Sequence, residues 1–222
     1  MTMLRVSNLS VSIASASILE GVALDVAPGT FTGLMGRNGA GKTTVMRSVM
    51  GLIPARSGDI RFDGTDLARQ PAHVRARLGI GYMPEDRRLV PELTVRENIL
   101  VPGWACKLVD AEDRLAGIYR LLPEVEKFAM RKAMQLSGGQ QKLVALARAL
   151  MPGTKLVLLD EPFEGVAPAL AGRLVEVLSG LKDQGLSVLL SESDSTHSGD
   201  LVDALYVIER GRVTEAEAGA HA

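Results

Sequence analysis

A glycine-rich segment from Gly36 to Thr43 has the residue types and the spacing that phosphate binding needs. It fits the pattern G-x-x-x-x-G-K-[ST], between an apolar segment and a helical one. Glycines let several N–H groups point into one concavity, and a following helix adds its positive end. Lys42 would meet the β- and γ-phosphates, and the Thr43 hydroxyl would ligate magnesium.

The segment therefore predicts a site for ATP with Mg2+. An exposed lysine on a glycine-rich turn is the alternative interpretation, and it fits this setting less well. The residues assigned to the loop are Gly36, Arg37, Asn38, Gly39, Ala40, Gly41, Lys42 and Thr43.

Two neighbouring acids, Asp160 and Glu161, follow the apolar run 156–159. Such a run predicts a buried strand, and the ends of parallel strands form the edge where an α/β sheet binds ligands. Asp160 could hold magnesium through water, and Glu161 could act as general base toward a water that attacks the γ-phosphate. Taken alone, the pair could equally be a strand that ends in two solvated acids.

A third motif, Leu-Ser-Gly-Gly-Gln-Gln at 136–141, precedes a predicted helix. Ser137 is a natural N-cap, and the glycines Gly138 and Gly139 would let a phosphate approach the helix end. Two phosphate surfaces on separate rigid elements cannot serve one nucleotide, so the motif predicts a dimer. By itself, the motif could be no more than a helix-start turn.

Alternating apolar strands and helices must position these motifs, which predicts an α/β domain with a largely parallel sheet. Antiparallel strands at the N-terminus and a helical middle, about 86–150, would be additions to one domain spanning 1–222. The tail 215–222 is expected to fray. The predicted strands are 4–13, 22–26, 31–35, 59–62, 80–83, 156–159, 188–190 and 204–208, and the predicted helices are 42–50, most of 93–134, 139–151 and 167–182.

Composition narrows the class of protein. The 222 residues suit one domain, and a formal net charge of −1 gives no support to nucleic-acid binding. The single cysteine, Cys106, excludes an internal disulfide. The N-terminus lacks a signal-peptide profile, and the apolar runs are far shorter than the roughly 20 residues of a spanning helix. Any membrane role is therefore expected to act through a partner.

The order of the three motifs resembles the ATP-binding-cassette family over essentially the whole chain. The resemblance implies a P-loop core with an antiparallel β subdomain and an α-helical subdomain. It also implies a head-to-tail dimer in which each ATP meets 36–44 of one subunit, Thr44 included, and Ser137, Gly138, Gly139 and Gln140 of the other. Hydrolysis at Glu161 would reopen the dimer, and the helical part would contact a membrane subunit at the cytoplasmic face of the cell membrane.

A finer resemblance is to the shorter ATP-binding subunit of branched-chain amino acid importers. It depends on Pro84-Glu85, followed by paired arginines, and on Gly-x-Ala-Pro at 165–168. Urea and amide importers are similar as well. Such a subunit would partner a second ATP-binding subunit, membrane permeases and, indirectly, a substrate-binding protein. Glu85 stands where most members carry Gln, so the resemblance assigns it to the γ-phosphate and magnesium.

Two positions depart from the family pattern. Ile13 stands where an aromatic residue usually stacks on adenine, and Ser193 stands where a switch histidine usually contacts the γ-phosphate. The pattern predicts an aliphatic adenine wall and a short γ-phosphate sensor. Ser193 leaves open a weakly hydrolysing regulatory partner. A soluble cassette ATPase of translation or DNA repair is the alternative from another class of function.

Overall fold

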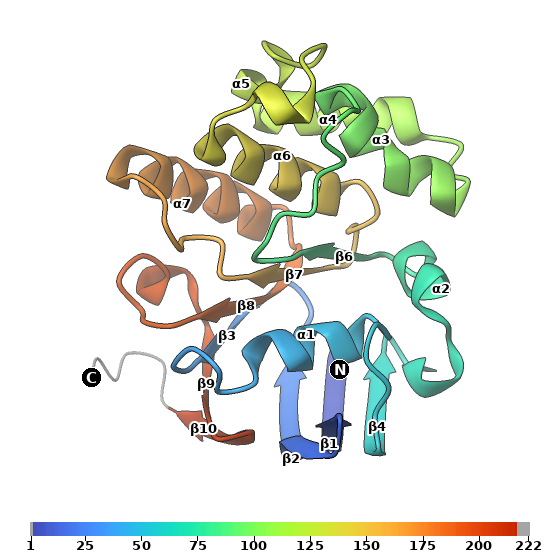
Figure 1. The fold of residues 1–222 in the computed structure, drawn as a ribbon, viewed down its shortest axis with the longest axis vertical. Coiled ribbons are helices and arrows are strands. Elements are labelled where there is room, and N and C mark those ends of the chain that lie inside the picture. Colours follow the sequence, from blue (N-terminus) through green and yellow to red (C-terminus); the bar gives the residue numbers. More distant parts are fainter. Residues whose placement is uncertain (1, 217–222) are drawn as a thin grey trace.

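The computed structural model describes residues 2–216, which fold into two sheets with helices between and above them (Figure 1). The larger sheet has the order β10-β9-β3-β8-β7-β6, and its strands are parallel except β10. Its strands are β3 (Phe31–Met35), β6 (Ile80–Met83), β7 (Leu156–Asp160), β8 (Ser187–Glu192), β9 (Ala204–Glu209) and β10 (Arg212–Ala216). This architecture confirms the predicted α/β class.

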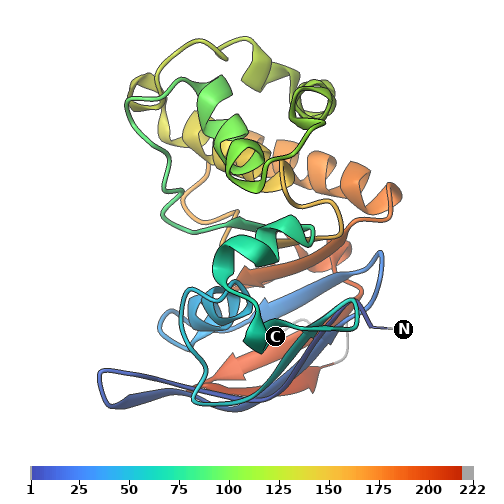
Figure 2. The same cartoon turned by 90° about the vertical axis from the view of Figure 1, so that its right-hand side faces the viewer.

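The smaller sheet is antiparallel, with the order β2-β1-β4-β5. Its strands are β1 (Leu4–Ile13), β2 (Ala16–Val26), β4 (Ser57–Phe62) and β5 (Thr65–Asp66). Helix α1 (Lys42–Val49) lies between the two sheets (Figures 1 and 2). One core joins all three layers, because apolar side chains of α1 pack with those of both sheets.

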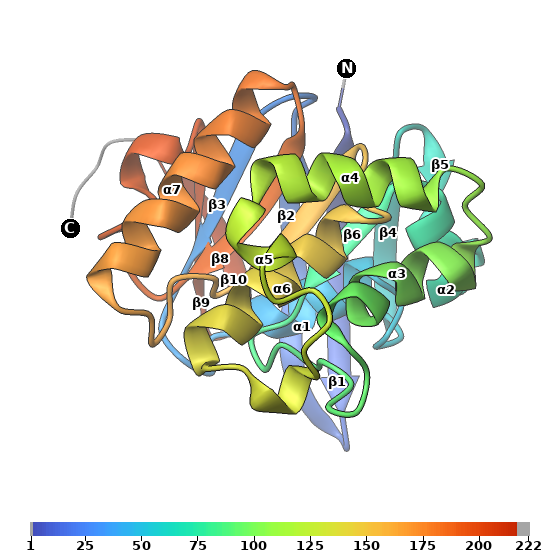
Figure 3. The same ribbon diagram turned by 90° about the horizontal axis from the view of Figure 1, so that it is seen from above.

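Helices cover the other face of the larger sheet, with α6 and α7 nearest to it and α3 to α5 above them (Figures 1 and 3). Along β7, Val157 and Leu159 join the core on the helical side, while Leu156 and Leu158 join the core around α1. Burial on both faces explains why these strands are apolar throughout. The helices are α2 (Ala72–Arg77), α3 (Val95–Cys106), α4 (Ala111–Leu121), α5 (Pro123–Glu126), α6 (Gly138–Leu150) and α7 (Pro168–Asp183), with short 3-10 turns at Leu67–Arg69, Ala133–Gln135 and Gly199–Leu201.

The structure corrects two predictions of secondary structure. The segment that holds β5 and α2 was not predicted, because its strand has two residues and its helix six. The tail is not wholly frayed, since Glu215 and Ala216 belong to β10, which pairs with β9 through a turn at Gly211. That pairing is tertiary and leaves no local pattern. Residues 217–222 lie outside the described part.

Helices α3 to α6 fall within the range predicted for the helical insertion, 86–150. The boundaries of that subdomain remain a prediction. Within residues 2–216, no helix is long and apolar enough to cross a membrane.

Candidate nucleotide site

The phosphate loop joins the end of β3 to the start of α1, as predicted. Two of its glycines are required by close packing. A Cβ at Gly36 would lie 2.4 Å from the backbone oxygen of Ile208, and a Cβ at Gly41 would lie 2.7 Å from a methyl group of Leu19. Gly41 also has a φ of 118°, in the left-handed region that favours glycine. The loop is therefore fixed against both sheets.

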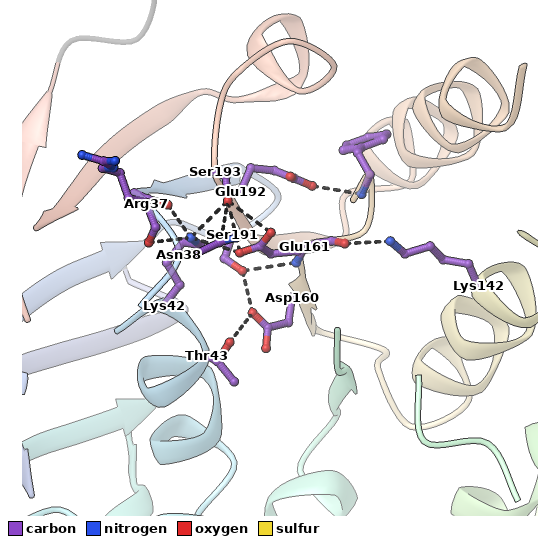
Figure 4. A network of polar contacts seen from close by, with 12 residues as sticks. Arg37, Asn38, Lys42, Thr43, Lys142, Asp160, Glu161, Ser191, Glu192 and Ser193 are labelled. Carbon is purple, nitrogen blue, oxygen red and sulfur yellow. Dashed lines mark hydrogen bonds and ion pairs between the residues drawn. The ribbon is translucent and has the colours of Figure 1, made fainter. Parts of the chain in front are cut away.

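Lys42 is buried at the base of this loop, with 4% of the residue exposed. Its ammonium donates to the backbone oxygens of Gly36 and Arg37 and lies 3.0 Å from a carboxylate oxygen of Glu161 (Figure 4). Both side chains of this ion pair are almost wholly buried, with exposures of 3% and 7%. The first residue of α1 thus meets the residue that follows β7.

Asp160 is completely buried at the end of β7, where three hydroxyl groups surround its carboxylate. Ser191 donates to Oδ1 at 2.8 Å, Thr43 to the same oxygen at 3.2 Å, and Tyr82 to Oδ2 at 3.2 Å. Burial raises the pKa of Asp160, and the hydrogen bonds from Ser191, Thr43 and Tyr82 offset part of that rise. The predicted neighbours Thr43 and Asp160 therefore meet, although 117 positions separate them.

Ser193 follows β8 and lies beside Lys42 and Glu161 (Figure 4). Its hydroxyl donates to Oδ1 of Asn38 at 2.9 Å and lies 3.2 Å from a carboxylate oxygen of Glu161. It is also 3.4 Å from the ammonium of Lys42. Short as it is, this side chain reaches the catalytic candidates directly.

A cleft of about 330 Å³ opens over the phosphate loop. Glu85 lines it, and the pKa of Glu85 is raised by burial first and then by the nearby carboxylates of Glu164, Glu161 and Asp160. A gathering of negative charge beside a lysine and a helix N-terminus suits a cation together with phosphate. The residues that line the cleft are Ile18, Asn38, Gly39, Gly41, Lys42, Thr43, Thr44, Glu85 and Glu161.

The sequence of this chain is similar to those of known proteins. The family model described as ABC transporter matches residues 19–164. The high-affinity branched-chain amino acid transport ATP-binding protein BraG of Pseudomonas aeruginosa is 34% identical over 98% of this chain and 94% of that protein. The lipopolysaccharide export system ATP-binding protein LptB of Escherichia coli strain K12 is also 34% identical, over 96% of this chain and 89% of its own length.

Solved structures agree with the sequence comparison. A nucleotide-free ATP-binding cassette from an ABC transporter superposes with a TM-score of 0.86 at 30% identity, over 98% of this chain and 92% of the other. The ADP conformation of the cassette MJ1267 gives a TM-score of 0.85 at 30% identity, over 98% and 91%. The chain belongs to the ABC transporter family. It is an ATP-binding subunit that hydrolyses ATP.

Two residues of the site fit part of a magnesium-binding site. Thr43 and Asp160 supply a hydroxyl and a carboxylate within one hydrogen bond of each other, which are ligand types that magnesium prefers. Over residues 2–216, no group of three or more acidic, histidine or cysteine side chains is arranged to hold a metal by itself. Magnesium usually keeps water and phosphate ligands, so this sparse donor set fits the ion.

The signature motif of this ABC ATPase begins helix α6, as predicted. Ser137 caps the helix: its hydroxyl accepts from the N–H of Gln140 at 3.3 Å, and the Gln140 side chain accepts from the N–H of Ser137 at 3.1 Å. Ser137 and Gly138 are exposed. None of Ser137, Gly138, Gly139 and Gln140 is among the residues that line the cleft over the phosphate loop.

The structure adds side chains that sequence reasoning missed. Tyr82 and Ser191 bind Asp160 from β6 and β8, the strands on either side of β7. The sequence shows only that each is a polar residue near the end of an apolar strand. Their contact with Asp160 could be inferred only from the strand order, which places β6 and β8 beside β7. Ile18 of β2 lines the cleft, whereas Ile13, at the exposed end of β1, is not among the lining residues. The assignment of Ile13 to the adenine remains a prediction.

Proposed function

We propose that the cleft binds magnesium-ATP and that Glu161 is the general base of its hydrolysis. The observation that carries this proposal is the convergence of Lys42, Thr43, Asp160 and Glu161 at one sheet edge. Thr43 and Asp160 would hold magnesium, which would neutralise charge on the phosphates when bound. Lys42 would exchange its contact with Glu161 for the phosphates, which frees the carboxylate to accept a proton from water. Ser193 would orient that carboxylate, and Glu85 would approach the γ-phosphate side.

A second part of the proposal concerns the dimer. The N-terminus of α6 is exposed at Ser137 and Gly138, and the positive end of a helix suits a phosphate. Because these residues do not line the chain's own cleft, we assign them to the nucleotide of a second ATP-binding subunit. Two nucleotides would then be enclosed between two chains.

Glu161→Gln tests both parts. It should slow hydrolysis by two orders of magnitude or more, on the scale of losing one catalytic group, while magnesium-ATP converts the monomer to a dimer in size-exclusion chromatography. Combining it with Ser137→Arg should block the dimer and leave ATP binding intact. A Glu161→Gln variant that hydrolyses at the wild-type rate would remove the general-base assignment.

The third part is the transport role. We infer that the chain energises an importer of branched-chain amino acids, with permeases, a second ATPase and a substrate-binding protein, at the cytoplasmic face of the cell membrane. BraG supports this inference through its identity and its coverage of nearly both whole chains. The protein named "Probable branched-chain amino acid transport ATP-binding protein LivF" of Archaeoglobus fulgidus, 32% identical over 95% of this chain and 90% of its own length, adds to it. Export of lipopolysaccharide is the second candidate function, because LptB and BraG have the same sequence identity to this chain, 34%.

Affinity purification of a tagged chain from native membranes separates these candidates. If the chain energises an importer, the purified complex should contain two permeases and a second ATPase. Loss of the gene should then reduce uptake of radiolabelled leucine. Restoring the gene with Lys42→Ala should not restore uptake. Recovery of a lipopolysaccharide permease would favour export, and recovery of ribosomes or DNA would contradict a transport role.

A further inference from the structure

Backbone carbonyl groups bind the ammonium of Lys142, in the first half of α6. Only 3% of this residue is exposed. Its Nζ donates to the backbone oxygen of Glu161 at 2.9 Å and to that of Glu164 at 2.5 Å (Figure 4 shows the first contact). Burial lowers the pKa of Lys142. Burying an ammonium is costly unless it is hydrogen-bonded, so these two acceptors explain how the fold tolerates the charge.

The carbonyl groups belong to a turn whose first residue is strained. Glu161 has a φ of 50°, in the left-handed region that is unfavourable for a residue with a side chain. The N–H of Glu161 donates to the backbone oxygen of Ser191 at 3.0 Å. The N–H of Glu164 donates to the backbone oxygen of Glu161 at 3.3 Å and closes the turn. On one side the turn is thus fixed by β8 and on the other by Lys142.

A buried carboxyl group holds the middle of the same turn. Glu192, at the end of β8, accepts the N–H of Phe163 at 3.0 Å and is 6% exposed. The backbone from Glu161 to Glu164 is therefore held at three points by residues outside it. A strained conformation persists only where its surroundings determine it to this extent.

We propose that Lys142 is a positioning residue for ATP hydrolysis, because its ammonium fixes the turn Glu161–Glu164 and so sets the direction of the Glu161 carboxylate. The inference rests on the proposed role of Glu161 as general base. Lys142 is not among the residues that line the cleft, so it acts through the backbone and not on the nucleotide.

The position of Lys142 also links the two nucleotide sites. It lies on the helix that begins at the signature motif, two residues after Gln140. If a nucleotide of the partner subunit binds Ser137–Gln140 and shifts α6, the hydrogen bonds of Lys142 to Glu161 and Glu164 would move the turn with the helix.

The first test measures steady-state hydrolysis by the full chain with Lys142→Met, which keeps the length of the side chain and removes its donors. We expect kcat to fall about 10- to 100-fold, the effect of misplacing a catalytic group, with the Kd for a non-hydrolysable ATP analogue within about twofold of wild type. Arg75→Met is the matched control. Arg75 is also buried and donates to the backbone oxygens of Ser48 and Val49, so its loss should lower stability and leave kcat unchanged.

The decisive test is a double-mutant cycle with Glu161→Gln. If Lys142 acts through Glu161, Lys142→Met lowers the residual hydrolysis of the Glu161→Gln variant by less than twofold. A full loss in that background, or an unchanged kcat in the wild-type background, would overturn the inference. If Lys142→Met fails to fold, Lys142→Gln, which keeps a donor, decides by the same cycle. Failure of the proposed function itself would show differently, as a Glu161→Gln variant with wild-type activity.

Discussion

The ammonium of Lys42 lies 3.0 Å from the carboxylate of Glu161, and solvent reaches almost none of either side chain. Lys42 is the residue assigned to the phosphates, and Glu161 is the one assigned to the attacking water. The two opposite charges therefore neutralise each other in this structure. In the proposed mechanism ATP would replace one partner of this buried ion pair, which would couple nucleotide binding to activation of the general base.

Lys42→Met should destabilise the nucleotide-free protein by about 3–5 kcal/mol, because it leaves the buried charge of Glu161 without its partner. The double variant Lys42→Met with Glu161→Gln should regain most of that loss. Denaturant unfolding without nucleotide measures both. Arg5→Met, which breaks an exposed pair with Asp25, is the control and should change stability little. Equal losses in the single and double variants would show that the ion pair does not contribute.

Ser193→Ala should lower kcat about tenfold and change KM little, because its hydroxyl lies 3.2 Å from the Glu161 carboxylate and donates to Asn38. Ser193→Thr keeps the hydroxyl and should retain most of the activity. Initial rates over a range of ATP concentrations separate the two parameters. A large rise in KM with an unchanged kcat would instead place Ser193 in ground-state binding of the nucleotide.

The part of the site that could be predicted is the part that is local in sequence. Gly36–Thr43 follows β3 and precedes α1, so strand, loop and helix are read from one continuous stretch. Asp160 and Glu161 follow an apolar run that only a buried strand explains. The Ser137 cap was predicted in the same way, from the residue that begins a helix.

What could not be predicted depends on the order of strands. Tyr82, Asp160 and Ser191 come from three consecutive strands in space, β6, β7 and β8, that are far apart along the chain. Lys142 was likewise hidden, because its partners are backbone oxygens, which no residue type reveals. Strand β10 depends on its pairing with β9, since its five residues carry no alternation of their own.

Glu192→Gln should make stability less dependent on pH. Burial, followed by the charge of Glu161, raises the pKa of Glu192 from 4.5 to about 7, while the Phe163 N–H and Lys142 act in the opposite direction. The folded chain therefore keeps this proton where the unfolded chain has lost it. The resulting stabilisation is complete below pH 4.5 and is lost as the pH rises toward 7 and above.

The free energy of unfolding should fall by about 3 kcal/mol over this pH range, at 1.36 kcal/mol for each unit by which the pKa of Glu192 is raised. Denaturant unfolding at pH 5 and pH 8 should therefore show a larger decrease for wild type than for Glu192→Gln, which stays neutral and can still accept the Phe163 N–H. Asp63→Asn, at an exposed pair with Lys155, serves as the control. Parallel pH profiles for wild type and Glu192→Gln would exclude a neutral Glu192 in the folded state.

Ile13→Tyr should strengthen the binding of ATP about fivefold, on the order of 1 kcal/mol for a base that stacks on an aromatic ring. Ile13 ends β1 at a two-residue turn and is 44% exposed, so a larger ring can be accommodated there without repacking the core. Calorimetry with ATP and with inorganic tripolyphosphate separates the contribution of the adenine base to affinity from that of the phosphates, because only ATP has a ring that can stack. Val207→Tyr, at an exposed position on β9, controls for an added aromatic surface. If the two ligands gain equally, Ile13 does not face the adenine, and the wall of the cleft formed by Ile18 is the place to introduce the ring.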